Sequence, residues 1–176
     1  MDSLIDGILV WWLQKGRYAW SKFRRKYCER KYSSGELPEV DSLEDIETCL
    51  KKVTWTMDGP LHLFDSISYP QRVWAKKKDD CDGFAVLSAA LLNRLSKEYE
   101  PVLITVMMRP VKASHTVCAF KVTLEDMWFF DNYTLRRGEC KTYDYIEALV
   151  SQRGKRVICW DVRDPETFDM IEFHRI

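Results

Sequence analysis

From Asp80 onward the sequence changes from one helical pattern to a series of strand patterns, and this order limits the folds open to the chain. Asp80 is a good N-cap for a helix over about residues 81–97, whose apolar side chains share one face. Pro101 ends the helical region. Three runs with strand character follow at residues 102–108, 115–122 and 127–131, the last two joined by a turn near residues 124–126.

The segments on either side of this block complete a mixed α+β pattern. Asp41 or Ser42 caps a helix that runs to about Lys52, and Pro70 opens a short one. Residues 143–152 read as a further helix closed by Gly154, residues 156–162 as a fourth strand, and residues 170–176 as an edge strand. Helices that precede a run of neighbouring strands predict an α+β domain with a mostly antiparallel sheet.

The first 32 residues form an amphipathic, basic segment before this domain. They hold eight Lys/Arg and three Asp/Glu, a net charge of +5. One stripe at helical spacing is apolar and aromatic: Ile5, Ile8, Leu9, Trp12, Ala19, Trp20, Phe23 and Tyr27. We expect this stripe to pack on the domain formed by residues 41–176, giving a single globular unit. The alternative is a surface that contacts a membrane or a partner, because basic charge stands beside aromatic residues.

Composition and cysteine spacing exclude several classes of protein. The 176 residues are 46% hydrophobic and 31% charged, which fits one folded domain, and 27 basic residues balance 27 acidic ones, so no nucleic-acid partner is expected. No C-x-x-C or C-x-x-H pair offers a zinc half-site, and no glycine-rich phosphate loop is present. We therefore expect neither a metal nor a cofactor. Without a secretion signal or an apolar run of membrane length, a cytoplasmic location is expected.

Cys81 is the candidate nucleophile, because it falls in the first turn of the predicted helix. Backbone N–H groups and the helix dipole favour a thiolate there, and the same N–H groups can donate hydrogen bonds to the oxyanion formed when a thiolate attacks an amide. A histidine has to serve as the base. Of the three histidines, His62 lies in an irregular stretch and His174 near the end, whereas His115 opens a strand.

Asp131 is the candidate partner of His115. It ends the next strand, and a hairpin that turns near residues 124–126 brings it within one to three residues of the position opposite His115. A carboxylate at that distance can fix the tautomer and the orientation of the imidazole. Asn132 is an alternative partner, and because successive strand residues point to opposite faces, only one of the two can face His115.

These residues resemble the transglutaminase-like branch of the papain-like cysteine enzymes. The resemblance lies in Asp80-Cys81-Asp82-Gly83-Phe84-Ala85, in Ser114-His115-Thr116-Val117 and in Trp128-Phe129-Phe130-Asp131-Asn132, and within the family it is strongest to small bacterial and phage cysteine peptidases. It covers roughly residues 55–132. The family pattern has glycine where this chain has Asp79, and often an aromatic residue where it has Val117.

The resemblance implies a papain-like core in which Cys81, His115 and Asp131 act as nucleophile, general base and orienting carboxylate. The Cys81 backbone N–H would supply one oxyanion donor, with Trp55 or Gln71 as the second. The implied activity is cysteine-dependent acyl transfer from a peptide or side-chain amide, by hydrolysis as a peptidase or amidase. A transglutaminase that passes the acyl group to an amine is the alternative, and so is a non-catalytic binding module on the same fold.

Overall fold

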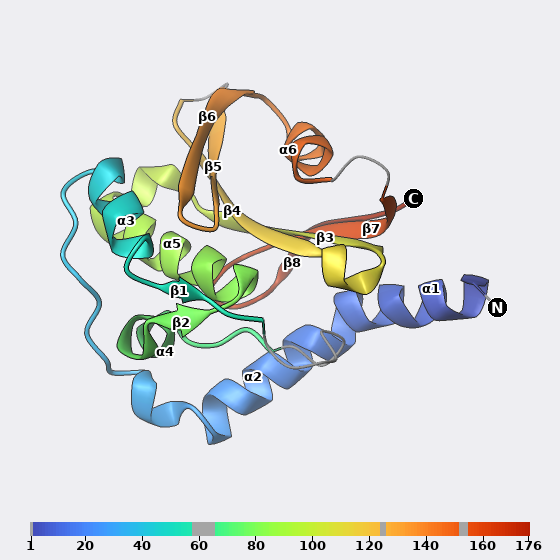
Figure 1. Ribbon diagram of the computed structural model, residues 1–176, viewed down its shortest axis with the longest axis horizontal. Coiled ribbons are helices and arrows are strands. Elements are labelled where there is room, and N and C mark those ends of the chain that lie inside the picture. The colour runs from blue at the N-terminus through green and yellow to red at the C-terminus, as the bar shows by residue number, and fades with distance from the viewer. Residues whose placement is uncertain (1, 58–65, 124–125, 152–154) are drawn as a thin grey trace.

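A computed structural model of the protein describes residues 2–57, 66–123, 126–151 and 155–176 (Figure 1). The longer helices are α1 (Asp2–Trp11), α2 (Arg17–Tyr27), α3 (Leu43–Leu50), α4 (Pro70–Lys76), α5 (Cys81–Leu95) and α6 (Tyr143–Val150). A π-helical turn, η1 (Trp12–Gly16), joins α1 to α2, and short 3-10 turns lie at η2 (Arg30–Tyr32), η4 (Lys97–Tyr99) and η5 (Val111–Ala113).

Six strands form one antiparallel sheet. They are β3 (Val102–Arg109), β4 (His115–Lys121), β5 (Met127–Asp131), β6 (Thr134–Cys140), β7 (Arg156–Arg163) and β8 (Met170–Arg175), in the spatial order β6-β5-β4-β3-β7-β8. Every neighbouring pair is antiparallel. Two very short strands, β1 (Thr54–Trp55) and β2 (Lys78–Asp79), pair in parallel apart from this sheet. The expected α+β class is confirmed.

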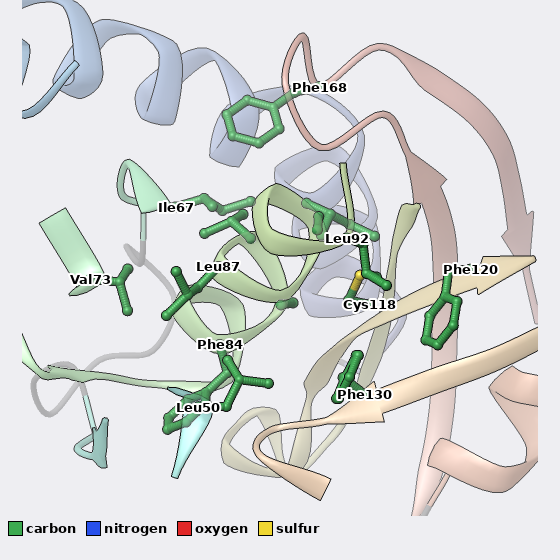
Figure 2. Packing of buried hydrophobic residues seen from close by; sticks show 14 of the residues in the cluster. Leu50, Ile67, Val73, Phe84, Leu87, Leu92, Cys118, Phe120, Phe130 and Phe168 are labelled. Carbon is green, nitrogen blue, oxygen red and sulfur yellow. The ribbon is translucent and has the colours of Figure 1, made fainter. Parts of the chain in front are cut away.

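Helices cover both faces of the sheet, and alternate residues of the strands divide between two apolar clusters. On one face α5 lies against the sheet: Figure 2 shows Leu92 of this helix near Cys118 of β4, and both belong to a buried cluster that also includes Phe130 of β5. On the other face Ile146 of α6 packs over a second set of strand residues that includes Val106, Val117, Phe129 and Trp160. Because β3 lies inside the sheet and is covered on both faces, it reads as a continuous apolar run rather than an alternating one.

The capping signals account for where the helices begin. The Ser42 hydroxyl accepts the backbone N–H of Asp45 at the start of α3, and a carboxylate oxygen of Asp80 accepts that of Asp82 at the start of α5. Ser42, rather than Asp41, is therefore the cap of α3. Pro70 occupies the first turn of α4, where its missing N–H costs no hydrogen bond.

The N-terminal segment forms one helical rod, α1–η1–α2, but it packs through a face other than the predicted stripe. Leu9, Leu13 and Tyr18 are buried against the domain, and so are the polar side chains of Arg17 and Arg25. Most of the predicted stripe is exposed instead, so the expectation that it packs on the domain was wrong for all but Leu9 and the partly buried Trp12. Buried arginines that bind the domain hold the rod in place. The hydropathy pattern did not predict this packing, because it places arginine side chains in solvent.

The predicted strands and helices agree closely with the structure, but β6, the short pair β1 and β2, and the π-helical turn η1 were not predicted. β6 was not predicted, because its sequence TLRRGEC alternates weakly and contains glycine. The tail that was expected to add an edge strand does so as β8. The turn near residues 124–126, the helix end at Gly154 and His62 fall wholly or partly outside the described residues.

Candidate active site

Cys81 is the first residue of α5, at the position that its sequence context predicts. Asp80 caps the helix, and its carboxylate oxygen accepts the backbone N–H of Asp82 at 3.2 Å. The Cys81 side chain is a thiol that forms no disulfide, and its exposure is intermediate. A thiol in the first turn lies beside backbone N–H groups that have no acceptor within the helix, and this environment favours the thiolate.

His115 and Asp131 are directly hydrogen-bonded. His115 Nε2 lies 2.8 Å from Asp131 Oδ1, where β4 begins and β5 ends. The register pairs Cys118 with Phe130, so Asp131 is diagonal to His115 across the two strands. The hydrogen bond from His115, aided by its charge and by the nearby Arg136, holds the pKa of Asp131 below its usual range despite partial burial. Asp131 is therefore an ionised acceptor that fixes the ring of His115.

One pocket brings the nucleophile and base candidates together. Cys81 and His115 both line it, at the junction of the α5 N-terminus with the β4 end of the sheet. The contributing residues come from the N-terminal rod, from the loop between β3 and β4, and from several strands: Trp12, Arg17, Trp55, Met57, Asp80, Cys81, Thr105, Met107, Val111, Lys112, Ala113, Ser114, His115, Thr116 and Asn132.

The other described cysteines differ from Cys81 in their surroundings. Cys118 and Cys159 are buried in the core, and burial raises the pKa of the Cys118 thiol well above its usual value and that of Cys159 to about 12. Cys49 is also buried, and Cys28 is exposed at the end of α2. None of these four lines the pocket, so Cys81 is the one among the described cysteines that lines the same pocket as His115.

The structure separates the alternatives that the sequence left open. Asp131, and not Asn132, is hydrogen-bonded to His115. Asn132 has a φ of 52° in the turn between β5 and β6, a left-handed conformation that asparagine tolerates, and it lines the pocket. Trp55 also lines the pocket, whereas Gln71 lies in a separate depression beside Leu37 and packs next to Gly35.

Arg17 is a pocket residue that the sequence did not reveal. It reaches from α2 to Asp82, the residue after Cys81, with Nη2 to Oδ2 at 2.6 Å and side-chain exposures of 7% and 1%. It also donates to the hydroxyls of Thr105 and Thr116 at 3.3 and 3.5 Å. The N-terminal rod thus holds the start of α5 against the sheet, and with Trp12 it builds one wall of the pocket. No local pattern marks an arginine that pairs with a carboxylate 65 residues away.

Three carboxylates flank the candidate nucleophile in the sequence. Asp79, Asp80 and Asp82 are buried, and their oxygens lie within 4.8 Å of one another, a grouping that could hold a metal ion. Each already has a partner in the chain: Arg72 is 3.4 Å from Asp79, Asp80 caps α5, and Arg17 pairs with Asp82. A Cβ at position 83 would collide with the Asp79 side chain, so Gly83 makes room for this aspartate.

We expect Arg17→Met to lower the free energy of unfolding by about 3–5 kcal/mol, because it leaves the buried Asp82 carboxylate without its cation. Lys22→Met is the matched control on the same rod. Lys22 is 3.6 Å from Asp169, and both side chains are more than half exposed, so its loss should cost about 1 kcal/mol or less. Urea unfolding followed by circular dichroism measures both. Equal stabilities for the two variants would show that the buried pair does not hold the rod.

Comparisons with known proteins identify neither a family nor a curated relative: no family model and no curated protein matches the sequence. Among solved structures, calcium-bound Legionella pneumophila LapG matches with 14% identity and a TM-score of 0.48, over 67% of this chain and 62% of that one. EGTA-treated Legionella pneumophila LapG matches with 13% identity and a TM-score of 0.49, over 89% and 88%. The chain thus spans less than two thirds of the calcium-bound LapG chain. Similarity at this level assigns no activity, which has to be argued from the site itself.

Proposed function

We propose that the protein is a cysteine-dependent acyl-transfer enzyme that hydrolyses peptide or side-chain amides with Cys81, His115 and Asp131. The observation that carries the proposal is the 2.8 Å hydrogen bond between His115 Nε2 and Asp131 Oδ1, in a pocket that Cys81 shares with His115. The resemblance to transglutaminase-like cysteine peptidases assigns the same three residues the same roles.

In the first half of the reaction, the Cys81 thiolate attacks the amide carbonyl carbon and a C–S bond forms. The oxygen becomes an oxyanion, which accepts hydrogen bonds from the Cys81 backbone N–H and from Trp55 as the second donor. Nε2 of His115 is held by Asp131, so Nδ1 exchanges protons with sulfur and substrate. Protonated His115 gives its proton to the departing nitrogen, the C–N bond breaks, and a free amine leaves behind a thioester on Cys81.

In the second half, water resolves the thioester. His115 removes a proton from the water, hydroxide adds to the thioester carbonyl, and the C–S bond breaks. The products are a carboxylic acid and regenerated Cys81. Asp131 remains ionised throughout and stabilises the imidazolium each time it forms.

Product analysis tests the proposal. The purified protein is incubated with a peptide library that contains glutamine residues and a soluble primary amine, and the products are identified by mass spectrometry. We expect new carboxyl and amino termini or released ammonia, without incorporation of the amine. Incorporation of the amine in place of water would show that the protein is a transglutaminase. The absence of any product would favour a non-catalytic binding module. Either result overturns the hydrolytic proposal.

A further inference from the structure

The exposed side of the N-terminal rod carries a continuous apolar strip. We define this apolar strip as Leu4, Ile8, Trp11, Trp20, Phe23 and Tyr27, whose exposures range from 45% to 72%. Leu4 and Ile8 form a shallow depression with Trp11, and Trp11 forms a second, largely apolar groove with Trp20 and Phe23. Phe23 stacks on Trp20 with ring centroids 5.6 Å apart and contacts Tyr27 at 4.8 Å, which extends the strip to the end of α2.

The π-helical turn η1 makes this strip continuous. Trp11 and Trp20 are nine residues apart, or about two and a half turns of regular α-helix, which would place them on opposite sides. A π-turn holds more residues per turn and so shifts α2 relative to α1. Both tryptophans therefore line one groove. Gly16 closes the turn, where a Cβ would collide with the Trp12 ring.

The exposed charge that the rod itself carries has one sign, and the one described acid beside it is Asp169, 3.6 Å from Lys22. Between residues 4 and 32, where side-chain exposure is described, the exposed charged side chains are all cationic, namely Lys15, Lys22, Lys26, Arg30 and Lys31. The two acids in this range, Asp6 and Glu29, are buried and paired with arginines. Lys15 lines the groove itself, and the ammonium of Lys26 lies 5.3 Å from the centre of the Tyr27 ring.

We propose that the apolar strip and its lysines dock the protein on an anionic lipid surface, with the rod lying in the plane of the headgroups. Aromatic side chains beside lysines suit the boundary between headgroups and acyl chains, and the lysines attract acidic lipids. A helical rod about 40 Å long offers a linear contact that fits a flat surface. Within the described residues, no helix combines the length and apolar character that a membrane crossing needs, so the contact is with the surface.

The same rod connects this surface to the candidate active site. Trp12 lines both the apolar groove and the pocket that holds Cys81, and Arg17 on the inner side of the rod also lines that pocket. A docked rod therefore holds the pocket beside the lipid surface. The docking proposal itself does not depend on catalysis.

Vesicle flotation tests the proposal with the full chain. Vesicles of phosphatidylcholine mixed with phosphatidylserine are compared with vesicles of phosphatidylcholine alone, at low salt and at about 0.15 M salt. We expect the protein to float with the anionic vesicles, less so at the higher salt, and not with the neutral ones. Lys15→Glu/Lys22→Glu/Lys26→Glu should weaken the partitioning by about a hundredfold or more, and Trp11→Ala/Trp20→Ala should also weaken it.

The matched control is Lys52→Glu/Lys97→Glu/Lys141→Glu, which makes the same change in net charge at exposed lysines elsewhere. It should bind as the wild type does, and circular dichroism checks that all variants are folded. An equal loss in the control and the rod variant would overturn the proposal, as would equal binding to neutral and anionic vesicles or no binding at low salt. A dimer in sedimentation analysis that Trp11→Ala/Trp20→Ala converts to a monomer would assign the strip to a second copy of the chain instead, which also overturns it.

Discussion

Cys81→Ala is expected to remove amide hydrolysis while leaving the fold intact. In the proposed mechanism Cys81 is the covalent nucleophile, and loss of such a nucleophile lowers turnover by about a million-fold, because water in the same pocket cannot form the thioester. The assay is the peptide-library reaction described above. The side chain of Cys81 is only partly buried, so its truncation leaves little cavity, and unfolding monitored by circular dichroism should change little.

Cys28→Ala is the matched control for this experiment. Cys28 is exposed at the end of α2 and does not line the pocket, so its replacement should leave turnover unchanged. Residual hydrolysis by folded Cys81→Ala at a rate near that of the wild type would show that another group performs the reaction. An equal loss in both variants would point to a general effect on the protein rather than to a nucleophile.

Asp131→Asn is expected to cost about a thousandfold to ten-thousandfold in turnover. The neutral amide cannot stabilise the imidazolium of His115, and it can also pair with the wrong tautomer of the ring. Asp169→Asn is the control, since Asp169 is an exposed carboxylate whose described ion pair is with Lys22 at 3.6 Å. A loss of less than tenfold in Asp131→Asn would indicate that the hydrogen bond seen in the structure does not serve the reaction.

The stability difference between the wild type and Asp131→Asn is expected to depend on pH. The pKa of Asp131 is lower in the folded protein than in the unfolded chain, chiefly because of the hydrogen bond from His115. The ionised carboxylate therefore contributes stability above the unfolded value of about 3.9, and this contribution is lost as the pH falls through the depressed folded value. The stability difference between wild type and Asp131→Asn, measured by thermal unfolding, should shrink as the solution is acidified below about pH 4.

The three candidate site residues were predictable because each stands at the boundary of an element with a strong local signal. Asp80 caps the helix that begins at Cys81, and the alternation of β4 and the apolar run of β5 place His115 and Asp131 at strand ends. Antiparallel pairing of two consecutive strands then brings the histidine and the aspartate together without any long-range information.

The features that the sequence did not reveal depend on contacts between distant segments. Arg17 appears as one more cation on a basic helix, yet it is buried against Asp82 and lines the pocket. The packing face of the rod was assigned to the wrong side because the π-turn shifts α2 and because arginines supply part of the buried face. Local periodicity assumes regular α-helix and apolar packing throughout, and the rod departs from the first at η1 and from the second at Arg17 and Arg25.

The alkylation rate of each cysteine as a function of pH, in wild type and in His115→Ala, tests the central claim most directly. An ordinary thiol has a pKa of about 8.5 and reacts slowly near pH 6. We predict that Cys81 is alkylated rapidly at pH 6 in the wild type, that exposed Cys28 is slow at that pH, and that buried Cys118 and Cys159 are protected. In His115→Ala, Cys81 should slow to the rate of Cys28. If Cys81 reacts no faster than Cys28 in the wild type, or keeps its advantage without His115, the proposed couple between the two residues is contradicted.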